Sequence, residues 1–352
     1  LVGPGSTPVT DVGNGDVGIF VDTRPDNDDI GADNETGYSL FLGPANTVSD
    51  NRSDNGGGSL DAVGGDVSAG VLITGTSSNT RVFGNFIGLF QFPAGGTPIG
   101  SLDTGNAGNG IVVTTSDNQI GGSQAFEANL ILRNARHGIL LRGSATSNNI
   151  IRGNFIGVSA PTGLGIFDFG NGGDGIHISG ASSTTIGGTG GFDDNVIAAN
   201  GRHGIALRAG SPSNGWANLI QRNQIYGNDR NAADGIDALG IDLERIVNAP
   251  DPIPDPIDPD PNDNYANFGQ NQPSVCAGGA GEPPACAGAT PPNFGGSNTS
   301  LQWTIGGTRP NTTLRIEFFS TTASGQTFLG EQVVTPNAAG EPTGAGCVAG
   351  LC

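Results

Sequence analysis

Lysine and methionine are absent from this chain of 352 residues, and all 14 basic residues are arginine against 33 acidic ones. Without lysine the chain cannot form a Schiff base or use an amine as a general base. The formal net charge of −19 argues against nucleic acid as a partner, because the phosphates would be repelled. No apolar run approaches the roughly 18 residues that a transmembrane helix needs, so membrane insertion is not expected.

Cysteine and histidine are scarce as well, and their placement limits the metal sites that the sequence predicts. The chain has four cysteines, all in its last quarter, and three histidines that lie elsewhere. A zinc site built on these cysteines is therefore not expected. Their close spacing predicts two local disulfides, and hence an oxidising, extracellular or cell-surface location. The predicted pairs are Cys276–Cys286 and Cys347–Cys352.

Glycine, in contrast, is abundant, with 62 residues or about 18 % of the chain against a usual ~7 %. It shows no three-residue period, which excludes collagen. It also interrupts every window in which a helical period could be sustained. Short apolar segments recur instead, each followed by Gly or Asn, as expected where strands end in turns with positive φ. We therefore expect an all-β fold.

The short segments repeat at a fixed interval. GVLITGTSSNTRVFGNFIG, GILLRGSATSNNIIRGNFIG and GIALRAGSPSNGWANLIQRNQIYG begin at Gly70, Gly138 and Gly204. NLILRNARHGI and NVIAANGRHGI begin at Asn129 and Asn195 and share nearly the same offset. We interpret the repeat, of roughly 66–70 residues, as several smaller units of about 20–25 residues.

The fixed period favours one of two all-β architectures. Short strands every few residues also occur in antiparallel sandwiches, but a coil of about 22 residues that repeats in register is typical of a parallel β-solenoid. About ten such coils would stack at roughly 4.8 Å. Two insertions, residues 89–108 and 158–173, follow equivalent NFIG segments, and we expect both to leave the same face of the solenoid.

Stacking is expected to place equivalent side chains above one another. Recurrent asparagines are predicted to form ladders, in which each amide hydrogen-bonds to an amide or to the backbone of the next coil. One turn carries Asn85, Asn154 and Asn223, and another carries Asn134 and Asn200. The predicted inward aliphatic row consists of Ile111, Ile139, Ile176 and Ile205.

The GNFIG, NNIIRGNFI and RHGIxLR segments resemble the repeats of right-handed parallel β-helix proteins with the pectate-lyase-like fold. More narrowly, they resemble the repeats of large secreted or surface-anchored bacterial proteins. The resemblance covers about residues 40–245. It implies a right-handed parallel β-helix (β-solenoid) followed by a small antiparallel β-sandwich-like module. Such repeats specify a fold strongly and an activity weakly.

We predict three parts along the chain. Residues 1–245 form the parallel β-helix, residues 246–296 an acidic linker rich in Pro and Gly with a disulfide loop, and residues 297–352 the β-sandwich-like module. In the module, SLQWTIGG, TLRIEFFST and TFLGEQVVT are predicted to be three antiparallel strands. Three strands make a thin sheet. Either more sequence completes it or a neighbouring molecule does so by strand addition.

Six arginines recur in the repeats and are candidates for binding glycans. Stacked guanidinium groups could bind uronate or sulfate with two hydrogen bonds each. The alternative is that they pair with acidic neighbours on the solenoid surface. The six are Arg136, Arg142, Arg152, Arg202, Arg208 and Arg222.

The histidines and carboxylates of the repeats do not reproduce a known catalytic signature. His137 and His203 share an RHGI context, and with three coils between them they would lie roughly 14 Å apart, too far for a shared metal. The spacing of the acidic candidates does not match the signature of hydrolases with this fold. We therefore assign no catalytic residue. The acidic candidates are Asp168, Asp174, Asp193 and Asp194.

Calcium is the one cofactor that the sequence suggests. Asp26, Asp28 and Asp29 precede Gly31 in a partial calcium-loop pattern with a shifted third acidic position, and the alternative is a solvated acidic turn. Four N-x-S/T sequons leave glycosylation open. The sequon asparagines are Asn34, Asn51, Asn298 and Asn311.

These features together predict an extracellular structural protein that serves in surface display, adhesion or self-assembly into a fibre or layer. The expected partners are other copies of the chain, through head-to-tail contact or strand addition, and cell-surface glycans. The alternative function is a polysaccharide lyase or hydrolase, or a passive glycan-binding module, on the solenoid face.

Overall fold

The structure is a computed structural model. It describes the backbone of thirteen stretches of the chain. These are residues 17–23, 41–42, 47–48, 69–75, 78–88, 105–159, 168–208, 217–230, 240–244, 274–275, 303–304, 313–322 and 325–335.

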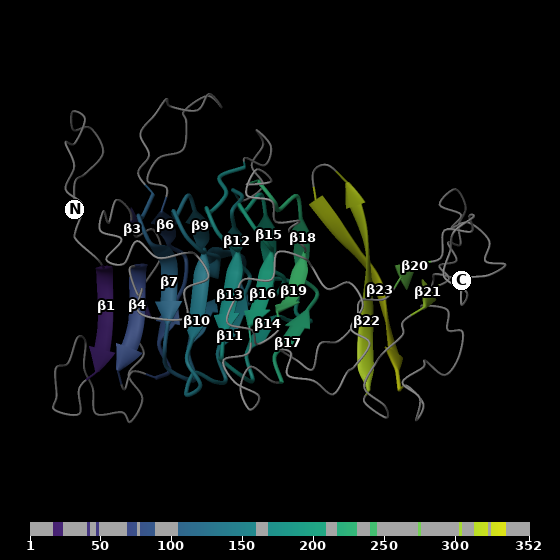
Figure 1. The fold of residues 1–352 in the computed structure, drawn as a ribbon, viewed down its shortest axis with the longest axis horizontal. Coiled ribbons are helices and arrows are strands. Elements are labelled where there is room, and N and C mark those ends of the chain that lie inside the picture. The colour runs from purple at the N-terminus through teal and green to yellow at the C-terminus, as the bar shows by residue number, and fades with distance from the viewer. Residues whose placement is uncertain are drawn as a thin grey trace.

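Three parallel sheets run side by side along the longest axis of the molecule (Figure 1). The chain passes through sheet A, then sheet B, then sheet C, and returns to sheet A one coil further on. Sheet A consists of β1 (Val17–Thr23), β4 (Ala69–Gly75), β7 (Asn109–Val113), β10 (Ile139–Arg142), β13 (Ile176–Ser179), β16 (Ile205–Arg208) and β19 (Ile241–Glu244).

The strands of the other two sheets are shorter, and they too pair in parallel. Sheet B consists of β2 (Phe41–Leu42), β5 (Arg81–Val82), β8 (Gln119–Gly121), β11 (Ile150–Arg152), β14 (Thr185–Gly187) and β17 (Leu219–Gln221). Sheet C consists of β3 (Thr47–Val48), β6 (Phe86–Gly88), β9 (Leu130–Leu132), β12 (Phe155–Ile156), β15 (Val196–Ala198) and β18 (Gln224–Tyr226). A single 3₁₀ turn, η1 (Ala125–Glu127), interrupts the described strands. The predicted all-β parallel β-helix is confirmed.

The predicted coil length, and with it the estimate of ten coils, is wrong. The step from one coil to the next is 28 residues between Asn109 and His137 and 29 residues between Asp174 and His203. Between His137 and Asp174 the step is 37 residues, because the chain adds residues between sheets C and A. Short and long coils alternate, so the sequence repeat spans two coils. Among the described residues, sheet A has seven strands.

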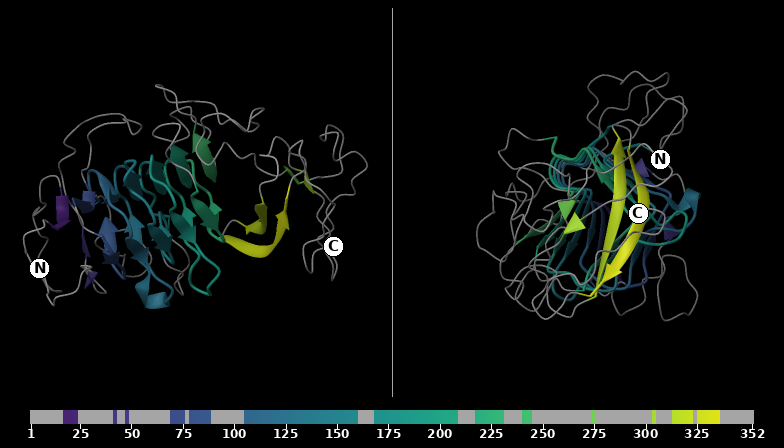
Figure 2. Two further views of the ribbon diagram at one scale, coloured as in Figure 1. Left: turned by 90° about the horizontal axis from the view of Figure 1, so that it is seen from below. Right: turned by 90° about the vertical axis from the view of Figure 1, so that its right-hand side faces the viewer.

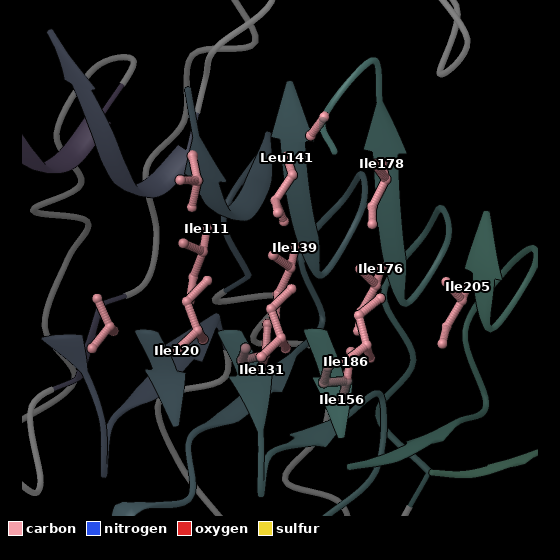
Figure 3. Close-up of a cluster of buried hydrophobic side chains, with 14 of the residues drawn as sticks. Ile111, Ile120, Ile131, Ile139, Leu141, Ile156, Ile176, Ile178, Ile186 and Ile205 are labelled. Carbon is pink, nitrogen blue, oxygen red and sulfur yellow. The ribbon is translucent and has the colours of Figure 1, made fainter. Parts of the chain in front are cut away.

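Aliphatic side chains from all three sheets fill the interior of the β-helix (Figure 3). The predicted row is confirmed, since Ile111, Ile139, Ile176 and Ile205 are register partners and all are fully buried. Burying one such side chain stabilises the fold by about 1.5–3 kcal/mol. Strands this short gain the stabilisation only when coils stack, because a single coil encloses no interior.

Amide ladders line the corners between the sheets, as predicted, and they are more complete than expected. At the corner before sheet C, side-chain amides join one coil to the next over 2.8–3.2 Å. The members of this ladder are Asn85, Asn129, Asn154, Asn195 and Asn223. The corner after sheet C carries a second ladder of Asn106, Asn134, Asn171, Asn200 and Asn228. The sequence repeat revealed every second member because it spans two coils.

Two antiparallel pairs follow the β-helix. The hairpin of β22 (Leu314–Thr322) and β23 (Gly325–Val334) has a bulge between Phe318 and Phe319 and confirms the predicted antiparallel module. The predicted three-stranded sheet is wrong, because β21 (Trp303–Thr304) pairs with β20 (Ser274–Val275) and not with the hairpin. The predicted domain boundaries at residues 245 and 296 lie outside the described residues.

Candidate functional site

Two histidines and one aspartate meet at the edge of sheet A where its strands begin. His137 precedes β10, Asp174 precedes β13 in the next coil, and His177 lies within β13. The register of sheet A brings them together, since Ile139 pairs with Ile176. Of the carboxylates that the sequence singled out, Asp174 is the one that lies beside histidines.

Both imidazoles approach the same carboxylate oxygen. His177 Nδ1 lies 2.8 Å and His137 Nδ1 lies 3.1 Å from Asp174 Oδ2. The two rings are 4.5 Å apart between centroids and tilted by 32°. One nitrogen from each histidine and one carboxylate oxygen all lie within 4.8 Å of one another. Three potential metal-ligand atoms therefore lie close together.

The cluster is enclosed by protein. The exposed fractions of His137, Asp174 and His177 are 2 %, 1 % and 4 %. Burial opposes ionisation of Asp174, but the hydrogen bonds and charges of His137 and His177 outweigh it and hold the pKa of the carboxyl well below its usual range. The carboxylate is thus ionised at neutral pH, and it accepts the hydrogen bond from His177 Nδ1.

The same residues form a corner ladder of their own. Asn109 Oδ1 accepts the N–H of His137, His137 Nδ1 accepts the N–H of Asp174, and Asp174 Oδ1 accepts the N–H of His203. Imidazole and carboxylate groups thus replace the amides of the other ladders. His203 Nε2 also lies 3.6 Å from Asp242 Oδ2 on β19.

The predicted separation of the histidines is corrected by this ladder. His137 and His203 lie two coils apart, not three, and Asp174 occupies the coil between them. The segments RHGI, GDGI and RHGI carry the signal that could have shown this. Aligned on their shared Gly-Ile, they place His137, Asp174 and His203 in one column.

The six candidate arginines lie at three different corners of the coil. Arg136 and Arg202 precede strands of sheet A, Arg142 and Arg208 end β10 and β16, and Arg152 ends β11. The sixth, Arg222, follows β17. Equivalent arginines lie in alternate coils. In sheet A, for example, Arg142 and Arg208 lie on either side of Ser179 in register.

Arg152 and Arg222 contact carboxylate or amide groups of this chain. Arg152 Nη2 donates to Gln119 Oε1 over 3.2 Å, and its Nη1 lies 3.8 Å from Asp193 Oδ1. Arg222 Nη2 lies 3.1 Å from Glu331 Oε2 on β23. These contacts match the alternative that the sequence left open, in which the arginines pair with acidic neighbours.

The remaining acidic candidates serve local contacts. Asp168 pairs with Arg230. Asp193 Oδ2 accepts the N–H of Gly190 over 2.8 Å, and Asp194 Oδ2 accepts a hydrogen bond from Gln224 over 2.7 Å. Each of these carboxylates thus contacts groups of this chain.

The hairpin packs against the last described coil of the β-helix (Figure 2). The Arg222 N–H donates to Glu317 Oε2 over 2.6 Å, and the Ile225 N–H donates to Gln326 Oε1 over 2.7 Å. The Arg222 guanidinium also lies 4.7 Å from the centre of the Phe328 ring. These contacts supply partners to a backbone group just after β17, the last described strand of sheet B, and to one on β18, the last described strand of sheet C.

Several predicted site residues lie outside the described part of the chain. The calcium candidates are Asp26, Asp28 and Asp29, the cysteines are Cys276, Cys286, Cys347 and Cys352, and the sequon residues are Asn34, Asn51, Asn298 and Asn311. Among the described residues, no helix is long and apolar enough to cross a membrane.

Comparison with known proteins gives no relative, since no family model, no curated protein and no solved structure matches this chain.

Proposed function

We propose that the protein is an extracellular structural protein, in which the β-helix is a rigid element for surface display, adhesion or self-assembly. The observation that carries this proposal is the continuity of the amide ladders. The ladder from Asn85 to Asn223 joins five successive coils without a break. Bending or opening one coil would leave buried amide groups without partners, at about 1–3 kcal/mol each.

The resemblance to repeats of large secreted or surface-anchored bacterial β-helix proteins forms part of this proposal. A pectate-lyase-like repeat implies a fold and only weakly an activity. The positions of the arginines favour the structural function. They lie at three corners, and Arg152 and Arg222 contact side chains of this chain.

The hairpin supports strand addition over head-to-tail stacking at this end of the β-helix. Gln326 and Glu317 of the hairpin already take up N–H groups of the last coil, where the next coil of a second molecule would have to bind. Among the described residues, β22 and β23 form a two-stranded sheet of their own, to which a strand of another molecule could add.

Electron microscopy and light scattering of the purified full chain test the structural function. We expect elongated particles that associate into ordered dimers or longer assemblies as concentration rises. Strictly monomeric particles at all concentrations would overturn self-assembly. A screen against polyuronates and neutral glycans separates the alternative, because unsaturated products or new reducing ends would show an enzyme, and glycan binding without turnover would show a binding module.

A further inference from the structure

We propose that His137, Asp174 and His177 bind one divalent transition-metal ion with the ligand preferences of Zn²⁺. This site was not expected from the sequence, and it is independent of the structural function proposed above. It would join two neighbouring coils, since His137 belongs to the coil of β10 and the other two ligands belong to the coil of β13.

The donor set selects the class of metal. Two imidazole nitrogens and one carboxylate oxygen are ligands that Zn²⁺ and neighbouring first-row ions prefer. Calcium and magnesium prefer sites made of oxygen atoms alone. The nitrogen-rich set therefore favours a transition metal over Ca²⁺.

The distances fit a shared ion after small movements. Zn–N and Zn–O bonds are about 2.0–2.2 Å long, so adjacent ligand atoms of a tetrahedral site lie about 3.3–3.6 Å apart. His137 Nδ1 lies 3.1 Å and His177 Nδ1 lies 2.8 Å from Asp174 Oδ2, so both nitrogens would move slightly away from the carboxylate oxygen. Three protein ligands also leave room for a fourth ligand such as water, as in other zinc sites.

The enclosure of the cluster also suits a bound ion. His137 Nδ1 accepts the Asp174 N–H and lies 3.1 Å from Asp174 Oδ2. The two residues are 2 % and 1 % exposed, so a cation between them would be attracted to its ligands in surroundings of low dielectric constant. To bind the ion, His177 would lose its Nδ1 proton and take the tautomer with the proton on Nε2.

The cluster lies outside the aliphatic interior. Ile176 and Ile178 point into the interior, so the alternation of the strand directs His177 to the outer side of sheet A. There it continues the row of Leu72, Val112 and Leu140. A metal ion can therefore reach the site through a local opening at the surface of the sheet, without disruption of the stacked isoleucines.

Titration of the metal-free full chain, produced without a polyhistidine tag, tests the site. With Zn²⁺ and with Co²⁺ we expect one equivalent to bind by isothermal calorimetry. We also expect visible Co²⁺ absorption bands typical of nitrogen and oxygen ligands, and a thermal midpoint raised by about 3–5 °C at a hundredfold excess over the dissociation constant. Absence of saturable binding and of the Co²⁺ bands would overturn the proposal.

Matched variants assign the ligands. H177Q and D174N should each weaken binding more than about 100-fold, because even loss of a group that only supports a ligand costs about 10- to 100-fold. H203Q changes the nearby imidazole of the same ladder and should retain binding. Unchanged binding in H177Q and D174N, or its loss in H203Q, would overturn this ligand assignment. Circular dichroism checks the fold of each variant, and if the ligand variants do not fold, the stoichiometry and Co²⁺ spectrum of the unaltered chain decide.

Discussion

At the scale of the residue, each corner of the coil needs a side chain that can accept an N–H from a neighbouring coil. The chain turns there, and the backbone groups at the turn are buried away from water. Asparagine meets this need because it both accepts and donates, and Asn154 shows both roles. It accepts from the Asn129 amide and donates to Asn195, Ile120 and Arg152.

Asn154→Ala should therefore be strongly destabilising. The change removes one of the two acceptors of the Asn129 amide, which keeps its bond to the Val82 carbonyl. It also removes the Asn154 amide that donates to the Ile120 carbonyl in the same buried corner. We expect a loss of about 2–4 kcal/mol in the free energy of unfolding. Urea denaturation followed by circular dichroism measures it. Ser144→Ala, at an exposed position, is the control and should change stability by less than about 0.5 kcal/mol. Equal stability of the two variants would contradict the role of the ladder.

The glycine immediately before β10 of sheet A is required because the coils pack closely there. A Cβ atom on Gly138 would lie 2.6 Å from the Gly175 carbonyl oxygen and 2.7 Å from Ile156 Cγ2. We expect Gly138→Ala to lower the melting temperature and to cost about 1–3 kcal/mol of stability. The matched control is Gly191→Ala, because a Cβ there would meet nothing within 4 Å. Calorimetry of both variants should show the loss in Gly138→Ala alone.

At the scale of the element, the strands of the β-helix depend on their neighbours, whereas the hairpin depends on a few polar contacts. Strands such as β12 contain two residues and have no stability of their own. The hairpin strands are longer, and Arg222 contacts both of them.

Arg222→Ala should loosen the hairpin and leave the β-helix folded. The variant loses the ion pair with Glu331 and the contact with Phe328. We expect faster amide hydrogen exchange in residues 314–334 and unchanged exchange in β7 to β16. Arg315→Ala is the control, since Arg315 lies 3.8 Å from the same Glu331 and contributes less. Equal acceleration in both variants would contradict a specific role for Arg222.

The packing of the hairpin should also depend on pH. Burial raises the pKa of the Glu317 carboxyl, against the Arg222 N–H that lowers it. A raised pKa in the packed state means that protonation favours packing. The stabilisation is therefore fully present below about pH 4.5 and is lost as the pH rises through the raised value. Hydrogen exchange corrected for intrinsic rates should show better protection of the hairpin at pH 4 than at pH 7, and Glu317→Gln should remove the difference.

At the scale of the whole molecule, stability comes from repetition along one axis. Each coil contacts mainly the coils before and after it, so removal of one complete coil should let its two neighbours stack on each other in the same register. The shortest complete coil measures 28 residues, the step from Asn109 to His137. Ile111 and Ile139 are separated by the same step.

Deletion of residues 111–138 should give a folded protein that is shorter by about 4.8 Å, because Gly110 would then lead into Ile139 in register. Deletion of residues 111–124 is the control, and it should unfold the β-helix because it shifts the corner ladders out of register. Small-angle scattering and circular dichroism measure both outcomes. A folded half-coil deletion, or an unfolded full-coil deletion, would contradict the coil length that the register of sheet A gives.

The sequence alone determined the all-β parallel β-helix, because the residues that form it repeat where coils stack. Ile111 and Ile139 could be paired, and Asn154 could be placed at a corner, from similarity between segments. The similarity between segments did not identify Asn129 and Asn195 as ladder members, because similar segments lie two coils apart. The coil length predicted from the same segments was wrong for the same reason.

The tertiary structure alone decided which unlike residues meet. His137 and His177 lie far apart in the sequence and belong to different repeat segments, so no similarity relates them. They share Asp174 because the chain between β10 and β13 returns to the same edge of sheet A after one lengthened coil. The contact of Arg222 with Glu331 has the same origin. Sequence periodicity shows where like residues stack, whereas contacts between unlike residues depend on the path of the backbone through space.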